Sequence, residues 1–172
     1  MSFFIIIRGS LGSGKSTLAK KLSKLLNAKY FSVDSILEKY DLTEEKEEGY
    51  ISQKSFITAN KIVTKDAKKA LEKNISVIFD GNFYWKSQIF DLIERLKFPH
   101  FVFTLKVPLR VCIKRDNKRR KSCGKDAVKA VYRKSTEFDY GISINANKSV
   151  EECVRIILKK IEGIVHINSR HA

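Results

Sequence analysis

The feature that most constrains this chain is a glycine-rich loop near its beginning, placed between an apolar run and a helical pattern. Residues 3–8 read FFIIIR, which predicts a short buried strand, and the next eight residues, GSLGSGKS, fit the spacing Gly-x-x-x-x-Gly-Lys-Ser. Leucines at helical spacing follow over residues 14–27. A strand that feeds a glycine-rich loop and then a helix N-terminus is typical of a phosphate-binding loop, and a plain glycine turn is the less favoured interpretation.

The residue types in this loop suit a bound nucleotide. Glycines let successive backbone N–H groups turn toward phosphate oxygens, and the helix N-terminus adds a partial positive charge. We expect Lys15 to reach the β- and γ-phosphates of ATP, Ser16 to hold Mg²⁺ and Thr17 to contact the α-phosphate. The predicted nucleotide-binding residues are Gly9, Ser10, Leu11, Gly12, Ser13, Gly14, Lys15, Ser16 and Thr17.

Strands and helices are expected to alternate along the 172 residues, which are treated as one domain, residues 1–172. The predicted strands are residues 3–8, 29–33, 75–81, 101–107 and 141–147. The predicted helices are residues 14–27, 35–48, 52–73, 86–96, a basic helix between Pro108 and Gly124, 126–137 and 149–161. Because the strands are continuous apolar runs, this alternation predicts an α/β fold in three layers, a parallel sheet with helices on both faces.

Composition adds expectations about the compartment. The chain contains no apolar run near the roughly 18 residues of a membrane helix, and its three cysteines are scattered without a Cys-x-x-Cys pair. Scattered, unpaired cysteines fit a reducing environment better than a disulfide framework. We therefore expect a cytoplasmic protein that does not contact a membrane and that is a monomer or a homodimer.

In its loop motif and in the order of its elements, the chain resembles the small P-loop kinases related to adenylate kinase. This group of the P-loop NTPase superfamily includes gluconate and shikimate kinases, chloramphenicol phosphotransferase and polynucleotide 5′-hydroxyl kinases. The resemblance spans nearly the full length, and its most specific part is residues 9–16. It implies a five-stranded parallel sheet in the strand order 2-3-1-4-5, a mobile lid at about residues 109–135, and the use of ATP with Mg²⁺.

Two aspartates follow predicted strands, and in a parallel sheet both lie at the edge where ligands gather. Asp34 follows the second strand, where the resemblance implies an aspartate that orients and deprotonates the acceptor hydroxyl; a helix N-cap is the structural alternative. Asp80 ends the third strand, where P-loop proteins keep a carboxylate that holds Mg²⁺. An acceptor role for Asp80 stays open, as does a simple turn, and Asn82 is expected to hydrogen-bond the acceptor.

The loop after the third strand reads DGNFYW, where adenylate kinases carry DGFPR, so a nucleoside monophosphate is a weaker prediction for the acceptor. Its aromatic residues are interpreted as core or pocket wall, and stacking of Trp85 on a base is an alternative.

Positive charge is concentrated in one segment. The chain has a net charge of +15, and residues 109–135 hold eleven Lys or Arg against two Asp, a local +9. Arg115 and Arg119 are four positions apart and share a helical face. The resemblance implies that they belong to a lid that closes over the nucleotide; a solvated basic helix is the alternative. The segment also argues for a nucleic-acid acceptor, whereas DLTEEKEE, residues 41–48, carries a local −4 and argues against one.

Together these features predict a kinase that transfers the γ-phosphate of Mg-ATP to a hydroxyl of a small molecule such as a nucleoside or a sugar. The alternatives are an RNA or DNA 5′-hydroxyl or tRNA-borne acceptor, a nucleotide acceptor, and a regulatory nucleotide switch that has no acceptor. A choice between ATP and GTP is not made. The predicted catalytic residues are Lys15, Asp34, Arg115 and Arg119, the predicted metal-binding residues are Ser16 and Asp80, and the predicted acceptor-binding residues are Asp34, Asp80 and Asn82.

Overall fold

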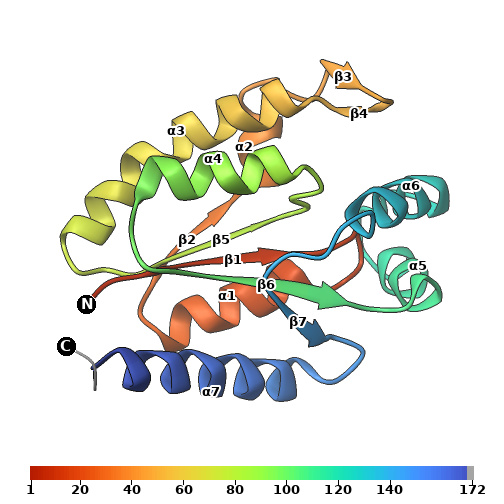
Figure 1. The fold of residues 1–172 in the computed structure, drawn as a ribbon. Coiled ribbons are helices and arrows are strands. Elements are labelled where there is room, and N and C mark those ends of the chain that lie inside the picture. The colour runs from red at the N-terminus through yellow and green to blue at the C-terminus, as the bar shows by residue number, and fades with distance from the viewer. Residues whose placement is uncertain (170–172) are drawn as a thin grey trace.

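The computed structural model describes residues 1–169, with side chains described as far as Gly163. Its centre is a five-stranded sheet in the order β2-β5-β1-β6-β7, with every neighbouring pair parallel (Figure 1). Counted among the parallel strands alone, this is the order 2-3-1-4-5, so that prediction is confirmed. The strands are β1 (Phe4–Arg8), β2 (Lys29–Ser32), β5 (Val77–Gly81), β6 (His100–Lys106) and β7 (Ile142–Asn145).

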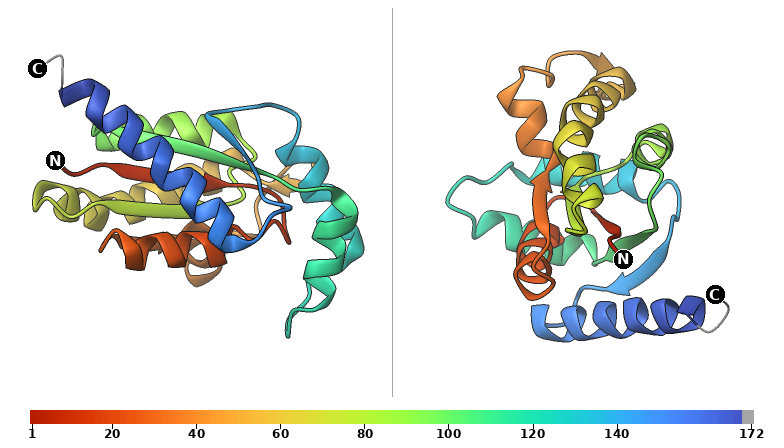
Figure 2. Two further views of the ribbon diagram at one scale, coloured as in Figure 1. Left: turned by 90° about the horizontal axis from the view of Figure 1, so that it is seen from below. Right: turned by 90° about the vertical axis from the view of Figure 1, so that its left-hand side faces the viewer.

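Helices cover both faces of the sheet, as the alternating pattern predicts (Figures 1 and 2). One face carries α1 (Lys15–Leu25) and α7 (Val150–Ser169), and the other carries α2 (Val33–Lys39), α3 (Gln53–Glu72) and α4 (Lys86–Leu96). The remaining helices, α5 (Leu109–Asn117) and α6 (Lys125–Ser135), stand beyond the carboxyl ends of the strands. No helix in the described part of the chain is long and apolar enough to cross a membrane.

Strand β1 shows why the sheet needs continuous apolar sequence. Phe4 and Ile6 belong to the core on the side of α3 and α4, whereas Ile5 and Ile7 belong to the core on the side of α1 and α7. All four side chains are completely buried. Because successive side chains of a strand point to opposite faces, a strand that is covered on both sides needs apolar residues at consecutive positions.

The predicted helix over residues 35–48 is wrong in its second half. Helix α2 ends at Lys39, and a two-stranded hairpin, β3 (Lys46–Glu47) and β4 (Tyr50–Ile51), follows it. The backbone turns away at Asp41, which has a positive φ of 51°, and the N–H groups of Asp41 and Leu42 reach back to the carbonyls of Glu38 and Leu37. These two hydrogen bonds form a Schellman motif with aspartate at the left-handed position. Glycine normally occupies that position, so the end of the helix cannot be recognised from the sequence.

The basic helix after Pro108 is also shorter than predicted, since α5 ends at Asn117 and not at Gly124. The segment between is closed on the buried carboxylate of Asp116, which accepts hydrogen bonds from Ser122 Oγ and from the backbone N–H groups of Cys123 and Gly124. These hydrogen bonds outweigh burial, and the pKa of Asp116 is lowered. The turn between α5 and α6 is therefore ordered around one charged group.

Candidate active site

The glycine-rich loop connects β1 to α1 and lies against the first turn of α5. Gly12 and Gly14 have φ angles of 73° and 89°, in the left-handed region that favours glycine. A Cβ added to Gly12 would lie 2.2 Å from the carbonyl oxygen of Cys112, so this position also has no room for a side chain. Gly14 is the N-cap of α1 and offers no side-chain hydrogen bond, which leaves the first amides of the helix available to an anion.

Lys15 lies where the loop faces the first turn of α2. Its side chain is almost completely buried, and its Nζ atom is 3.5 Å from the carbonyl oxygen of Ser10 and 3.9 Å from Oδ2 of Asp34. The two residues are 19 positions apart in the sequence, and the sheet brings them together as predicted. One ammonium group therefore touches both the phosphate-binding loop and the carboxylate that was predicted to prepare the acceptor.

The predicted metal-binding residues also meet. Ser16 Oγ donates a hydrogen bond to Oδ1 of Asp80 at 3.3 Å, and Asp80 is completely buried at the end of β5. Its other oxygen, Oδ2, accepts a hydrogen bond from the hydroxyl of Tyr30, and burial followed by this bond raises the pKa of Tyr30. A hydroxyl and a carboxylate are the hard oxygen ligands that Mg²⁺ prefers, so this pair fits that cation.

Tyr30 was missed at the level of sequence. It lies in β2 opposite Ile78 of β5, and nothing in the one-dimensional pattern separates it from an ordinary aromatic strand residue. In the structure it fixes the rotation of the Asp80 carboxylate, because it holds one oxygen while Ser16 holds the other.

Asp34 is the second residue of α2, and its predicted alternative role as helix N-cap is wrong. Ser32 is the N-cap, and its side chain accepts a hydrogen bond from the N–H of Ser35. The Asp34 carboxylate is 32% exposed and accepts a hydrogen bond from the N–H of Asn82 at 3.5 Å. Burial raises the pKa of Asp34, although the charge of Lys15 opposes the shift. A raised pKa strengthens a carboxylate as a proton acceptor.

Asn82 lies beside Asp34, as predicted for two acceptor-binding residues. Its side-chain Oδ1 atom is buried and has no hydrogen-bond partner among the described residues. The aromatic residues after it are interior: Trp85 is 7% exposed and its Nε1 donates to the carbonyl oxygen of Ile51, whose N–H donates to the hydroxyl of Tyr84. The stacking interpretation of Trp85 is therefore wrong, and the core or pocket-wall interpretation is confirmed.

A second residue missed in the sequence is Arg8, which ends β1 immediately before the loop and is completely buried. Its guanidinium donates to the carbonyl oxygens of Phe83, Phe138 and Ser135 and to Oγ1 of Thr104, and it lies 4.2 Å from the centre of the Phe138 ring. Burial lowers the pKa of Arg8 to about 10. The base of the phosphate loop is thus tied to the end of α6.

The predicted lid arginines lie beside the loop, on α5 and just after it. Arg115 donates hydrogen bonds to the carbonyl oxygens of Ser13 and Ala146, and Arg119 forms an ion pair with Asp116 at 3.7 Å. Both arginines line a cavity of about 410 Å³ whose walls also include Thr17 of α1. This cavity opens beside the N-terminus of α1.

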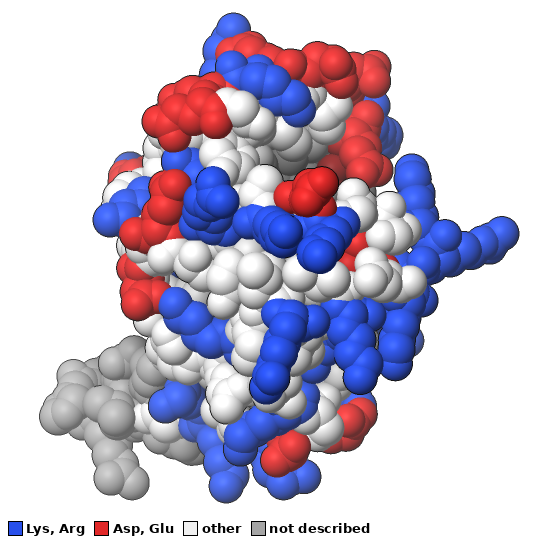
Figure 3. All heavy atoms as spheres, turned by 90° about the vertical axis from the view of Figure 1, so that its right-hand side faces the viewer, with Lys and Arg blue, Asp and Glu red and all other residues white. Residues whose placement is uncertain are grey.

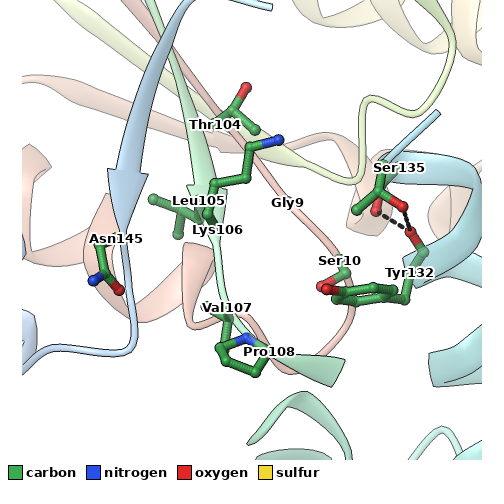
Figure 4. A pocket seen from close by; sticks show the side chains of 11 residues that line it. Gly9, Ser10, Thr104, Leu105, Lys106, Val107, Pro108, Tyr132, Ser135 and Asn145 are labelled. Carbon is green, nitrogen blue, oxygen red and sulfur yellow. Dashed lines mark hydrogen bonds between the residues drawn. The ribbon is translucent and has the colours of Figure 1, made fainter. Parts of the chain in front are cut away.

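A second cavity, of about 330 Å³, lies beside Gly9 and Ser10 of the loop (Figure 4). Its walls come from Ser10, from the end of β6, from Asn145 of β7, and from Tyr132 and Ser135 of α6. Helix α6 therefore borders an open space beside the phosphate loop.

A parallel sheet of this strand order, a phosphate-binding loop after β1 and two helices over the carboxyl edge together define the fold of small P-loop kinases. The AAA_33 family, described as an AAA domain, matches residues 4–138. The chain belongs to this family. Among curated proteins, none matches the sequence closely enough to count as a relative.

Solved structures agree with this assignment of the fold. A sugar kinase from Janibacter sp. HTCC2649 superposes with a TM-score of 0.78 at 14% identity, covering 94% of this chain and 95% of its own. A gluconokinase from Sinorhizobium meliloti 1021 gives 0.71 at 13% identity, covering 96% of each chain. A shikimate kinase from Aquifex aeolicus gives 0.59 at 21% identity, covering 94% of this chain and 98% of its own.

Proposed function

We propose that this protein is a Mg-ATP-dependent kinase that transfers the γ-phosphate to a hydroxyl group of a small molecule. The observation that carries this proposal is the position of Lys15, whose ammonium lies 3.5 Å from the loop carbonyl of Ser10 and 3.9 Å from the carboxylate of Asp34. Phosphoryl transfer depends on positioning and charge neutralisation, and it needs the cation and the acceptor-side carboxylate at the same place.

Each residue then has a defined task. The amides of the loop and the ammonium of Lys15 bind the β- and γ-phosphates, while Ser16 and Asp80 would hold Mg²⁺, which when bound neutralises charge on the phosphate oxygens. Asp34 accepts the proton of the attacking hydroxyl, and its raised pKa suits that task. Asn82 holds the acceptor beside it. Arg115 stays on the nucleoside side of the loop, because its guanidinium is bound to Ser13 and Ala146.

The names of the similar structures support a small hydroxylated acceptor. Three of them are called a sugar kinase, a gluconokinase and a shikimate kinase, and a fourth, from M. mycoides, a deoxyadenosine kinase. Among the buried cations near the site, Arg8 is engaged within the protein by four hydrogen bonds and Lys134 by two carboxylates. Arg8 and Lys134 are therefore not free to bind a carboxylate or phosphate group of an acceptor.

A phosphorylation screen tests the proposal. Purified protein is incubated with labelled Mg-ATP and with separate pools of nucleosides, sugars, nucleotides and RNA, in parallel with Asp34→Asn. We expect label to move into one compound of the sugar or nucleoside pool with the unchanged protein only. ATP hydrolysis at the same rate in every pool, without a labelled product, would contradict a kinase and support a regulatory nucleotide switch.

A second candidate acceptor is nucleic acid, and the charged surface favours it. Figure 3 shows Lys and Arg side chains over the face formed by α5 and α6, with acidic side chains gathered toward the hairpin. The exposed cations of residues 109–135 are Arg110, Lys114, Lys118, Arg119, Arg120, Lys121, Lys125, Lys129 and Arg133. Labelling in the RNA pool that weakens steeply with salt would replace the small-molecule proposal with this one.

A further inference from the structure

Lys134, in the last turn of α6, is an unusual lysine because it is only 4% exposed. Its ammonium lies 2.7 Å from Oε2 of Glu48 and 2.9 Å from Oε2 of Glu137. It also lies 4.1 Å from the centre of the Trp85 ring and 5.4 Å from that of Tyr50. Two carboxylates and two aromatic faces therefore surround one cation, which is the environment that a desolvated ammonium requires.

The partners of Lys134 come from segments far apart in the sequence. Glu48 and Tyr50 belong to the β3–β4 hairpin, Trp85 directly precedes α4, and Glu137 follows α6. The hairpin is itself fastened to the loop before α4, since Ile51 exchanges hydrogen bonds with Trp85 and Tyr84. Within residues 1–163, Lys134 makes the only ion pair between α6 and the hairpin.

The residue next to Lys134 faces the nucleotide side. The carbonyl oxygen of Ser135 accepts a hydrogen bond of 2.9 Å from Arg8, which directly precedes the phosphate loop. The same guanidinium holds the carbonyl oxygen of Phe83, in the loop that carries Asn82. Two successive residues of α6 therefore connect the base of the phosphate loop with the acceptor-side hairpin.

From this geometry we propose that Lys134 is a positioning residue, which fastens the lid helix α6 to the β3–β4 hairpin through Glu48 and so orders the acceptor side when nucleotide occupies the phosphate loop. The proposal rests on the proposed function and deepens it, because it names how the two substrates of one site are coupled. Without this link, the hairpin and α6 are held by separate contacts and respond to nucleotide separately.

The strength of the link suits a contact that opens and closes. The side chain of Glu48 is 63% exposed, so water can solvate its carboxylate when α6 moves away from the hairpin. An ion pair with such an exposed partner contributes little net stability. Burial lowers the pKa of Lys134, but the hydrogen bonds to Glu48 and Glu137 outweigh it, and the net pKa is raised. Lys134 therefore stays charged in the closed arrangement, and the attraction persists across the physiological pH range.

Hydrogen exchange tests the coupling without any acceptor. The amides of residues 46–51 are followed with and without a non-hydrolysable Mg-ATP analogue in the unchanged protein, in Lys134→Met and in the control Lys129→Met. Lys129 is exposed on the same helix and forms no ion pair within the described side chains. We expect the analogue to slow hairpin exchange about tenfold in the unchanged protein and in the control, and to leave it unchanged in Lys134→Met. Equal protection in all three proteins would overturn the proposal.

A second pair of variants covers the case in which Lys134→Met does not fold. Glu48→Ala removes the exposed end of the link, and Glu45→Ala is its matched control, because Glu45 pairs with Lys54 and not with α6. Trp85 is the only tryptophan, so its fluorescence reports directly on the ammonium above its ring. We expect the analogue-induced change in emission to be lost in Glu48→Ala and kept in Glu45→Ala, and a change kept in both would contradict the link.

Neither readout requires phosphoryl transfer, so the two proposals fail separately. Protection of the hairpin without a labelled product in the phosphorylation screen would reject the kinase and keep the coupling. A labelled product with no coupling between nucleotide and hairpin would reject the role of Lys134 and keep the kinase.

Discussion

The two sides of the candidate active site are assembled in different ways. The nucleotide side comes mainly from one contiguous stretch, residues 9–17, whose backbone geometry is set by glycines. The acceptor side combines side chains from α2, the hairpin, the loop before α4 and the end of α6, which are separated by up to about 100 residues in the sequence. In the proposed kinase, backbone amides bind the phosphates that all nucleotides share, whereas the assembled side chains select the acceptor. The first side is therefore general and the second is specific.

The largest expected effect is on the nucleotide side. Replacing Lys15 with Met removes the cation between the loop and Asp34, and we expect phosphoryl transfer to fall about 10³-fold. Lys24→Met, on an exposed position of the same helix, is the control and should keep full activity. Initial rates with labelled ATP measure both variants, and a loss below tenfold for Lys15→Met would remove that residue from the mechanism.

The next effect belongs to the acceptor side. Asp34→Asn keeps the shape of the side chain and abolishes its basicity, so we expect transfer to fall about 10²-fold while nucleotide affinity stays unchanged. Asp41→Asn, at an exposed position after α2, is the matched control. Titration calorimetry with Mg-ATP and rate measurements separate binding from chemistry, and transfer that survives within tenfold would show that Asp34 is not the base.

The pH dependence of phosphoryl transfer should report the protonation of Asp34 on the acceptor side. The pKa of Asp34 is raised by burial, so the free carboxylate forms only at a pH above the ordinary range of aspartate, and activity should fall as the pH drops through that raised pKa. The same shift means that Asp34 contributes less to folding stability as the pH rises through its raised pKa, because the unfolded chain releases that proton more readily. A rate profile of the unchanged protein that stays flat as the pH falls to the ordinary range of aspartate would contradict this assignment.

Sequence reasoning succeeds where a pattern is local. The loop, its strand and its helix are contiguous, and the remaining strands are recognisable because burial on both faces requires continuous apolar runs. The positions of Lys15, Asp34 and Asp80 then follow from the rule that the carboxyl ends of parallel strands share one edge. These three residues do lie together in the structure.

Sequence reasoning fails where the role of a residue depends on a distant partner. Arg8, Tyr30 and Lys134 read as a strand end, an aromatic strand residue and one lysine among many. Their hydrogen bonds to Phe138, Asp80 and Glu48 span 130, 50 and 86 positions of the sequence, respectively. The hairpin was missed for a different reason, because Asp41 ends α2 in a left-handed conformation that usually signals itself by glycine. Lys134 and the hairpin lie on the assembled acceptor side, whereas Tyr30 lies beside the predicted metal-binding residues.

Two glycines test how closely the nucleotide side is packed. Gly12→Ala would place its Cβ 2.2 Å from the carbonyl oxygen of Cys112, whereas a Cβ on Gly124 would meet nothing within 4 Å. Both positions have positive φ angles, and Gly124 lies at φ 89° and ψ 152°, a region that is essentially restricted to glycine. Backbone strain therefore already penalises Gly124→Ala, and a larger loss at Gly12 reports the packing of α5 on the loop. We expect Gly12→Ala to lower the free energy of unfolding by about 2 kcal/mol more than Gly124→Ala. Equal decreases in the free energy of unfolding, measured by chemical denaturation, would mean that α5 shifts to accommodate the added methyl group.

The smallest expected effect concerns the N-caps of one helix on each side of the site, α3 and α1. Ser52 caps α3 on the acceptor side, and its side chain accepts the N–H of Ser55, so that helix N-terminus is satisfied within the protein. Gly14 caps α1 without a side-chain hydrogen bond. Ser52→Ala should therefore cost about 1 kcal/mol of stability, measured by thermal unfolding, and leave nucleotide affinity unchanged. The affinity should not change because the N-terminus of α3 is already bound by its own cap side chain and offers no free amide to a phosphate. A changed nucleotide affinity in Ser52→Ala would show that the N-terminus of α3 influences the nucleotide site.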